Sequence, residues 1–599
     1  MPIAKGANII VDHLIAERVP YLFGLCGHGI IGLMDALNDR RDRIGTISVH
    51  NEQIAGFAAD AFFRVSRQPV GTFTSCGPGS VNIQMAVANA LFDGTPMLVI
   101  TGNIPTQQFN KGPFQEFGHH HQADYVTAMR PYTKRSFQAT RADQLPQMVR
   151  QAWNTMLAGP MGPVNLDVPF NVFTESAEAE ANPDAMWHRT LAVRPALPAE
   201  LVDLILDLLL QAERPLILAG HGCLLAEAST ELLEFSRALR IPVATTPQGK
   251  GILDADYELH LGPTGRDGVY PANRASRGCD LLLAVGTRFG DRSTSSWHDG
   301  VTHQIPPTRL IHIDLDPAIL GRNYNAAVGA VADAKQALRQ LIAAVKSRAD
   351  LSPQRRMAWI DATSQWKKRW DADTAVPKTS IETPLHPARV VSDLTRAVPT
   401  DAVVLSDIGA HHSWMVQQWP QKTSGRFLQS GGGATMGFGV GGAIGAQFAA
   451  PDRAVVAVVG DGGMLMHASA IATAVEYELP IVWVVWNNCG FVSIRDLQRA
   501  FFGKDREFAT RFRNRQKGEL TSVDFAMMAR SMGAQGFKAE RPGDVADQVS
   551  EALHSRKPTV IDALVASDAL RFTAGTWDLP PIDGLPPNYD PFPLGGVDA

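Results

Sequence analysis

The residue types with the clearest chemistry follow two apolar runs in the C-terminal third of the chain. Asp461 comes directly after RAVVAVVG, and Asn488 ends the run PIVWVVWNN. If both runs are parallel strands, their carboxyl ends meet at one edge of the sheet, where ligands bind. A carboxylate, an amide oxygen and a backbone carbonyl such as that of Gly490 suit a Mg²⁺ that keeps phosphate oxygens in its other positions. The alternative is two ordinary strand-to-helix turns, in which Gly, Asp and Asn are common.

A second acidic residue, Glu52, lies far upstream between two expected elements. It follows the strand-like run GTISV and precedes the helical run IAGFAADAFFRV. A carboxyl group at such a junction can exchange a proton with a ligand, although residues there are more often exposed caps. Further along, Gly77 and Pro78 follow the run VGTFTS in a glycine-rich turn that by itself indicates only a loop.

Glycines are concentrated in the segment QSGGGATMGFGVGG of the last third. Gly437, Gly439 and Gly442 form a GxGxxG pattern that would bind a dinucleotide if a strand came immediately before it. The preceding residues are polar and glycine-rich instead, so we expect close helix packing and backbone approach to a cofactor. A nicotinamide dehydrogenase is therefore the weaker interpretation.

The elements that must position these residues alternate along most of the chain. Strand-like runs such as PMLVITG, RPLILAG and DLLLAVG are separated by amphipathic helical stretches, a rhythm typical of parallel sheets with crossover helices. A chain of 599 residues exceeds the size of one hydrophobic core, so several domains are expected. Segments without an apolar period set the boundaries, and we expect α/β domains at residues 1–178, 199–347 and 383–570, with a Pro-rich tail at 571–599.

Composition and charge exclude several classes of protein. Lys and Arg number 55 and Asp and Glu 60, so a net charge of -5 offers no basic field for nucleic acid. No apolar run reaches the roughly 18 charge-free residues of a membrane span, and the start of the chain carries Asp12 and Glu17 within its apolar pattern, unlike a signal peptide. The five cysteines are scattered without a CxxC pair, so neither a disulfide framework nor a zinc site is expected, and a cytoplasmic location is favoured.

The order of these motifs resembles that of the thiamine diphosphate enzymes of the acetolactate synthase-like family. The matching series is Asn-Glu-Gln at 51–53, Gly-Pro-Gly at 77–79, Met-Gly-Phe-Gly at 436–439, Gly-Asp-Gly at 460–462 and Asn-Asn at 487–488. The resemblance covers nearly the whole chain. It implies three doubly wound parallel-sheet domains, of which the first binds the cofactor's pyrimidine and the third its diphosphate with Mg²⁺.

The resemblance also implies roles for individual residues. Glu52 matches the glutamate that hydrogen-bonds N1′ of the pyrimidine, and Met436 matches the apolar wedge that bends the cofactor. The positions of the Mg²⁺ ligands are Asp461, Asn488 and the carbonyl of Gly490. The other positions that match cofactor-binding segments are Gly27, Gly29, Gly77, Pro78, Asn82, Ile408, Gly409, Ala410, His411, Gly433, Gly460, Gly462, Gly463, Phe491 and Val492.

Enzymes of this family use a C2 ylid that adds to a carbonyl carbon and leaves an enamine after loss of CO₂. The resemblance therefore implies a lyase or carboligase acting on a 2-oxo acid. It also implies a homodimer or homotetramer, because Glu52 comes from one subunit and the metal-binding domain from another. A thiamine diphosphate-binding protein without catalysis is an alternative of another class, and the joint presence of Glu52, Met436 and Asp461 argues against it.

The substrate pocket departs from the acetolactate synthase pattern. Arg292 and Gln115 match pocket positions, but Phe170 replaces a lysine and Leu497 a tryptophan. The segments GHG, QGKG and FRNRQKGEL resemble instead the inositol-pathway trihydroxycyclohexane-dione hydrolase and the related cyclohexane-1,2-dione hydrolase. Hydrolysis of a cyclic or linear 1,2-dione is therefore the alternative activity, with His28 as a proton shuttle.

The central domain has features of a flavin site. Its glycine segment at 220–222 and the run 288–292 lie where flavin-bearing relatives hold FAD, but an empty domain of this family has the same residues. The sequence leaves FAD open as a cofactor beside thiamine diphosphate and Mg²⁺.

Overall fold

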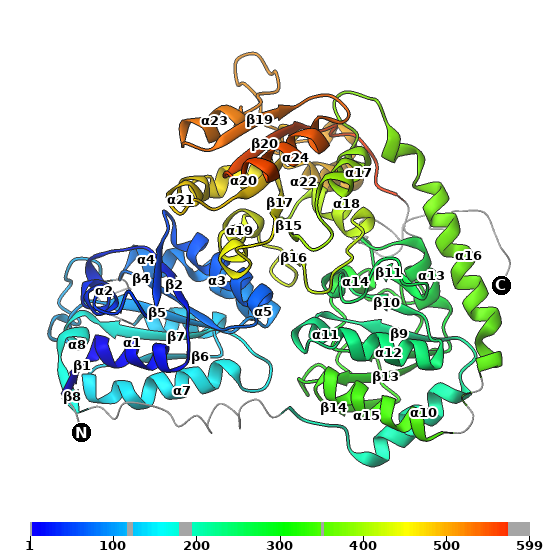
Figure 1. Ribbon diagram of the computed structural model, residues 1–599, viewed down its shortest axis with the longest axis horizontal. Coiled ribbons are helices and arrows are strands. Elements are labelled where there is room, and N and C mark those ends of the chain that lie inside the picture. The colour runs from blue at the N-terminus through cyan, green and yellow to red at the C-terminus, as the bar shows by residue number, and fades with distance from the viewer. Residues whose placement is uncertain (1–2, 117–123, 179–193, 349–350, 352, 573–599) are drawn as a thin grey trace.

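The computed structural model describes residues 3–116, 124–178, 194–348, 351 and 353–572. It contains three α/β units, the N-terminal one in blue, the central one in green and the C-terminal one in yellow to red (Figure 1). Each unit is built on a six-stranded parallel sheet, which confirms the expected fold class. Residues 179–193, between the first two expected domains, and all but two residues of the predicted Pro-rich tail lie outside the described residues. No helix in the described ranges is long and apolar enough to cross a bilayer.

The N-terminal sheet has the strand order β3-β2-β4-β5-β7-β6. Its strands are β2 (Tyr21–Gly24), β3 (Gly45–Ser48), β4 (Val70–Thr74), β5 (Met97–Asn103), β6 (Arg135–Gln138) and β7 (Val164–Pro169). The helices of this unit are α1 (Gly6–Ala16), α2 (Ile31–Asn38), α3 (Glu52–Ser66), α4 (Pro78–Asn82), α5 (Gln84–Asp93), α6 (Tyr125–Met129), α7 (Leu145–Leu157) and α8 (Phe170–Thr174). A short antiparallel pair, β1 (Ile3–Lys5) with β8 (Ser176–Glu178), joins the two ends of the unit.

The C-terminal sheet has the order β16-β15-β17-β18-β20-β19, which is the same topology. Its strands are β15 (Val403–Ser406), β16 (Phe427–Gln429), β17 (Val455–Gly460), β18 (Ile481–Asn487), β19 (Gln535–Ala539) and β20 (Thr559–Leu564). Its helices are α17 (Pro387–Ala397), α18 (Ala410–Gln418), α19 (Phe438–Ala449), α20 (Asp461–His467), α21 (Ala470–Glu476), α22 (Val492–Phe502), α23 (Phe525–Ser531) and α24 (Asp544–Ser555). Every residue of β18 is buried, as expected for a parallel strand covered by helices on both faces.

The central sheet has a different order, β11-β10-β9-β12-β13-β14, which is that of dinucleotide-binding doubly wound sheets. Its strands are β9 (Pro215–Ala219), β10 (Val243–Thr245), β11 (His260–Pro263), β12 (Leu281–Val285), β13 (Arg309–Asp314) and β14 (Val328–Val331). Its helices are α10 (Ala199–Gln211), α11 (His221–Leu225), α12 (Ser229–Leu239), α13 (Tyr270–Gly278), α14 (Asp291–Thr294) and α15 (Ala334–Ser347). The long α16 (Met357–Asp373) runs along the outer side of this unit toward the C-terminal one (Figure 1).

The N- and C-terminal units pack against each other through α3 and α19 and share one apolar core. Glycines make the close approach of these helices possible, because a Cβ on Gly445 would lie 1.8 Å from the carbonyl oxygen of Ala58. β16 ends at Gln429 and α19 begins only at Phe438, so no strand leads directly into the GxGxxG pattern. The glycines of α19 therefore serve helix packing, as the sequence predicts.

Candidate functional site

Both outer sheets reverse their strand order at one point, between β2 and β4 in the N-terminal unit and between β15 and β17 in the C-terminal unit. Ligands of doubly wound sheets bind in the crevice at the carboxyl ends of the strands at such a point. Most sequence-predicted cofactor residues follow these four strands: Gly27 and Gly29 after β2, Gly77 and Pro78 after β4, Ile408, Gly409, Ala410 and His411 after β15, and Gly460, Asp461, Gly462 and Gly463 at the end of β17. The topology thus gathers the candidates at one sheet edge in each unit.

Asp461 lies at the junction of β17 and α20 and is 2% exposed. Its Oδ1 accepts the N–H of Gly462 at 2.7 Å, and its Oδ2 accepts the N–H groups of Asn488 and Gly490 at 3.1 and 3.0 Å. Burial raises the pKa of Asp461, and the backbone N–H donors oppose that rise. The carboxylate therefore ties the turn after β18 to the end of β17.

Asn488 supplies an oxygen without a partner beside this carboxylate. Its Oδ1 is buried and accepts no hydrogen bond, a costly state for an amide oxygen unless a ligand takes it. Only glycine fits at position 490, because a Cβ there would lie 2.3 Å from the carbonyl oxygen of Thr510. Asp461, Asn488 and the Gly490 carbonyl form a donor set of hard oxygens that fits Mg²⁺. Among the described residues, no group of three or more His, Cys, Asp or Glu could hold a metal ion.

The turn after β15 places His411 against the end of β17. His411 is buried, its Nε2 has no partner, and burial lowers its pKa to about 4, so the ring is neutral at pH 7. A Cβ on Gly460 would lie 3.1 Å from this ring. The turns that open α18 and α20 therefore touch, so an anion at the N-terminus of α18 would lie beside the turn that opens α20.

Phe491 and Val492 follow the turn after β18, where Phe491 packs against the start of α20 and Val492 begins α22. A Cβ on Gly462 would lie 2.4 Å from the ring of Phe491, so Phe491 packs directly over the start of α20. Val492 is buried and begins α22. The ring of Phe491 also meets Phe512 edge-on, with 5.4 Å between centroids.

Asp407, the residue after β15, anchors the segment that contains Met436. Both of its carboxylate oxygens accept the N–H of Gly437 at 2.9 Å, and Oδ1 also accepts the N–H of Gly439 at 3.2 Å. Burial raises the pKa of Asp407 to about 6. The half-buried Met436 thus precedes a fixed turn into α19. Asp407 is not among the residues predicted from the sequence, although a carboxylate at the end of the run DAVVLSD was a usable signal.

Glu52 begins α3, whose N-terminus is capped by Asn51 accepting the N–H of Gln53 at 2.8 Å. Asn82 Nδ2 donates to Glu52 Oε2 at 2.6 Å, and Asn82 Oδ1 accepts from Gln53 Nε2 at 3.0 Å. Within the part of the chain that the structure describes, no hydrogen bond of Glu52 reaches Asp461. The next residue, Gln53, places its Oε1 3.0 Å from Nε2 of His467, so the start of α3 contacts the end of the helix that Asp461 opens.

His28 lies beside aromatic residues at the edge of the N-terminal sheet. Its exposed ring stacks on Phe170, with 5.3 Å between centroids and 14° between planes, and meets Phe114 edge-on at 6.3 Å. Cys76 Sγ donates to Gln115 Oε1 at 3.2 Å. Phe170, in the position where the resemblance expects a lysine, therefore supports His28 and supplies no charge to the predicted substrate pocket.

Arg292 is held in an ion-pair network. Its Nε donates to Asp267 Oδ2 at 2.7 Å and its Nη2 bonds the same oxygen, while Arg571 and Ser413 each donate to Asp267 Oδ1 at 2.6 Å. Burial opposes ionisation of Asp267, but the two guanidinium groups hold its pKa well below its usual range. Asp267 thus connects Arg292 and Arg571 to Ser413 of α18.

A cavity of about 760 Å³ lies between the N-terminal and central units. The central unit lines it at the carboxyl ends of β9, β12, β13 and β14 with Gly222, Gly286, Asp314, Leu315 and Asp333, and the N-terminal unit contributes Trp153 and Leu157. The central sheet reverses its strand order between β9 and β12. The cavity therefore lies where a sheet of this topology binds a dinucleotide.

Comparison with protein families identifies the class. Three families of the thiamine pyrophosphate enzymes match the chain: the N-terminal TPP binding domain at residues 4–124, the central domain at 202–341 and the C-terminal TPP binding domain at 407–563. Glu52 lies in the first match, and Asp461 with Asn488 in the last. The fold and the site together define a thiamine pyrophosphate enzyme.

Individual relatives narrow this class. The chain is 32% identical over 573 residues to the probable acetolactate synthase large subunit of Methanocaldococcus jannaschii, covering 94% of this chain and 92% of that protein. It is 32% identical over 568 residues to the acetolactate synthase large subunit of Parasynechococcus marenigrum (94% and 87%) and 28% identical over 561 residues to acetolactate synthase isozyme 3 large subunit of Escherichia coli (92% and 93%). The chain belongs to the acetolactate synthase-like family of thiamine diphosphate-dependent enzymes. These relatives do not favour the dione hydrolase alternative.

Proposed function

We propose that the chain is a thiamine diphosphate- and Mg²⁺-dependent carboligase that joins two molecules of a 2-oxo acid with loss of one CO₂, as the name acetolactate synthase implies for its relatives. The observation that carries the proposal is the unpartnered Asn488 Oδ1 beside the buried Asp461 carboxylate, at the point where the C-terminal sheet reverses. When bound, thiamine diphosphate supplies a carbon nucleophile for the substrate carbonyl and accepts the electrons left by CO₂.

The chain's own residues bind and orient this cofactor. Asp461, Asn488 and the Gly490 carbonyl hold Mg²⁺, and the segment 408–411 contacts the diphosphate. Glu52 holds a proton for N1′ of the pyrimidine. Because Asn82 donates to Glu52 Oε2, the other carboxyl oxygen, Oε1, is the one that carries this proton.

Two features supply the proposed substrate contacts: the guanidinium group of Arg292, and an aromatic wall formed by His28 and Phe170. Arg292, oriented by its hydrogen bond to Asp267, binds the carboxylate of the 2-oxo acid. His28, stacked on Phe170, and Gln115 line the pocket on the N-terminal side. An uncharged Phe170 makes this wall suited to the apolar end of the substrate.

A proton NMR time course with Mg²⁺, thiamine diphosphate and pyruvate tests the activity. Two pyruvate molecules are expected to disappear for each acetolactate and CO₂ formed. If pyruvate survives in protein that demonstrably holds its cofactor, carboligation of this 2-oxo acid is excluded. Cyclohexane-1,2-dione, added to the same sample, then tests the hydrolase alternative directly.

We also propose that the active site forms between two copies of the chain. No hydrogen bond joins Glu52 to Asp461 among the described residues, and exposed apolar side chains flank both of them: Val81 and Met85 beside Asn82, and Leu465 and Met466 on α20. Clustered exposed apolar side chains mark interaction surfaces. A two-fold pairing covers both surfaces at once and makes at least a dimer, with a tetramer formed by further pairing.

Met466→Glu tests this pairing. The substitution places a charge on α20, and a buried unpaired charge is expected to weaken association at least about tenfold and to remove carboligation with it. Size-exclusion chromatography with light scattering gives the mass, and Met527→Glu, at a 60% exposed apolar residue on α23, is the matched control. Wild-type mass and activity in Met466→Glu would contradict an active site shared between subunits.

We further propose that the cavity of about 760 Å³ binds FAD. The strand order of the central sheet, the bare backbone at Gly222 and Gly286, and the carboxylate of Asp314 beside them support a dinucleotide there. The purified protein is then expected to show flavin absorption in the visible range and to release FAD on heating. Colourless protein that takes up no added FAD contradicts this part of the proposal.

The domain division at 1–178, 199–347 and 383–570 and a cytoplasmic location complete the proposal. All five cysteines are free, four of them buried, which supports a reducing compartment. Small 2-oxo acids or diones are the proposed partners beside a second copy of the chain. Nucleic acid and membrane are not among them.

A further inference from the structure

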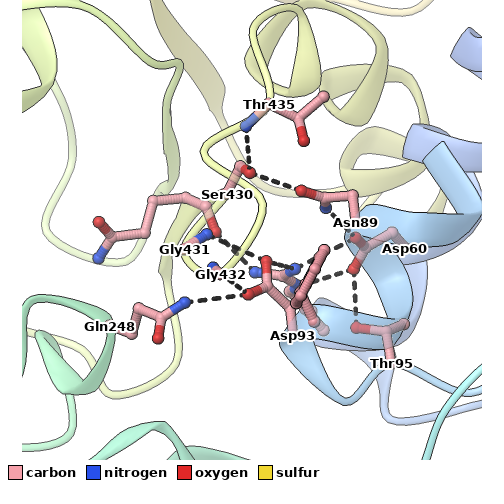
Figure 2. Close-up of polar contacts among 12 residues, drawn as sticks. Asp60, Asn89, Asp93, Thr95, Gln248, Ser430, Gly431, Gly432 and Thr435 are labelled. Carbon is pink, nitrogen blue, oxygen red and sulfur yellow. Dashed lines mark hydrogen bonds and ion pairs between the residues drawn. The ribbon is translucent and has the colours of Figure 1, made fainter. Parts of the chain in front are cut away.

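The loop between β16 and α19, residues 430–437, is held from outside its own domain (Figure 2). Asp93, at the end of α5 in the N-terminal unit, is 2% exposed and points at this loop. Its Oδ2 accepts the N–H of Gly431 at 3.1 Å, and its Oδ1 accepts the N–H of Gly432 at 2.8 Å and Nε2 of Gln248 at 2.9 Å. One carboxylate therefore joins all three units.

A buried arginine keeps this carboxylate charged. Arg64 Nη2 lies 2.7 Å from Asp93 Oδ2, its Nε lies 2.7 Å from Asp60 Oδ1, and its Nη1 donates to the carbonyl oxygen of Gln429 at 2.7 Å. Burial opposes ionisation, but Arg64 and the two loop N–H groups hold the pKa of Asp93 below its usual value. Burial raises the pKa of Asp60. Its carboxylate accepts from Asn89 Nδ2 and Thr95 Oγ1, each at 2.8 Å, so Asp60 reaches the loop indirectly, through Asn89 and Arg64.

Asn89 holds the first residue of the loop, Ser430, which in turn holds Thr435. Ser430 Oγ donates to Asn89 Oδ1 at 2.5 Å and accepts the N–H of Thr435 at 2.8 Å. A Cβ on Gly433 would lie 3.2 Å from the same Asn89 oxygen. The other side of the loop is open, since residues 432–434 are exposed. The loop, which contains Met436, is thus held by hydrogen bonds on one side and exposed on the other.

We propose that Asp93 is a positioning residue for the cofactor: it sets the conformation of the 430–437 loop, and with it the place of Met436, from the N-terminal unit of the same chain. The inference rests on the proposed contact of Met436 with thiamine diphosphate. Asp93 lies outside the site and touches no reacting atom. A loop with three consecutive glycines has high conformational entropy when unbound, so the acceptors that order it before binding raise the affinity for the cofactor.

The test compares Asp93→Asn with Asp60→Asn. Both substitutions remove one of the two carboxylates that face Arg64, so both are expected to lower the melting temperature of the apoprotein. Only Asp93→Asn also turns one of the two oxygens that accept loop N–H groups into an NH₂ donor, whereas Asp60→Asn keeps an amide oxygen for Asn89. The dissociation constant of thiamine diphosphate in Mg²⁺ buffer, from quenching of tryptophan fluorescence well below either melting temperature, is expected to rise about tenfold or more in Asp93→Asn and under about threefold in Asp60→Asn.

Equal affinities in the two variants, or wild-type affinity in Asp93→Asn, would overturn the inference and leave Asp93 with a role in stability alone. If Asp93→Asn does not fold, Gln248→Ala decides, since it removes one bond to Asp93 and leaves every charge in place. That variant is expected to weaken cofactor binding with only a small fall in melting temperature, and unchanged binding would overturn the inference equally. Cofactor binding by the wild-type protein distinguishes this inference from the proposed function. If the wild-type protein does not bind thiamine diphosphate, the proposed function is refuted, whereas the hydrogen bonds of Asp93 to the loop are unaffected.

Discussion

Glu52→Gln is expected to lower kcat by about 10²- to 10⁴-fold, the range for loss of a positioned acid or base. The substitution preserves the shape of the side chain, and the amide oxygen of Gln can still accept the hydrogen bond from Asn82. What it removes is the carboxyl proton proposed to sit on Oε1 toward the cofactor pyrimidine. The start of α3 keeps its Asn51 cap, so the fold is expected to remain intact.

Steady-state kinetics at saturating cofactor, together with the dissociation constant of thiamine diphosphate, measure this effect. The expected pattern is a large fall in kcat with a cofactor affinity within a few-fold of wild type. Glu551→Gln, an exposed glutamate on α24, is the matched control and is expected to behave as wild type. Unchanged turnover in Glu52→Gln would remove the proton-holding role and reopen the alternative of a binding protein without catalysis.

Asp461→Asn is expected to weaken Mg²⁺-dependent binding of thiamine diphosphate by about 100-fold or more, because the charged ligand of the proposed cation is lost. The amide keeps one oxygen for the N–H groups of Gly462, Asn488 and Gly490, but its NH₂ group faces at least one of them. Two donors then oppose each other in a buried place, so a smaller loss of stability is also expected.

Isothermal titration with thiamine diphosphate, in Mg²⁺ and in EDTA, separates the metal from the fold. Wild-type protein in EDTA is expected to bind as weakly as Asp461→Asn in Mg²⁺. Asp361→Asn, an exposed aspartate on α16, controls for loss of charge alone. Strong binding by Asp461→Asn that still responds to EDTA would place the cation on other ligands.

The strand-end residues could be predicted from sequence because their signal is local. Asp461 and Asn488 follow continuous apolar runs, and parallel strands buried on both faces have that pattern. The order of motifs along the chain then identified the family, because that order can be read from the sequence without knowledge of any contact. Glu52, Met436 and the metal-binding triad were named in this way, and their roles stay predictions until the substitutions above are measured.

Other features depend on contacts between distant parts of the chain. Asp93 precedes Gly94 at an ordinary helix end, and nothing in that text indicates a bond to Gly432, which is 339 positions away. Arg292 matches a substrate-binding position in sequence, yet only the structure shows that it shares the carboxylate of Asp267 with Arg571. Hydrophobic period and turn chemistry are properties of neighbours along the chain, so the sequence by itself determined the elements, their class and the family. Which polar groups meet was decided by the packing of three sheets, because a buried donor must find its acceptor wherever the fold brings one within reach.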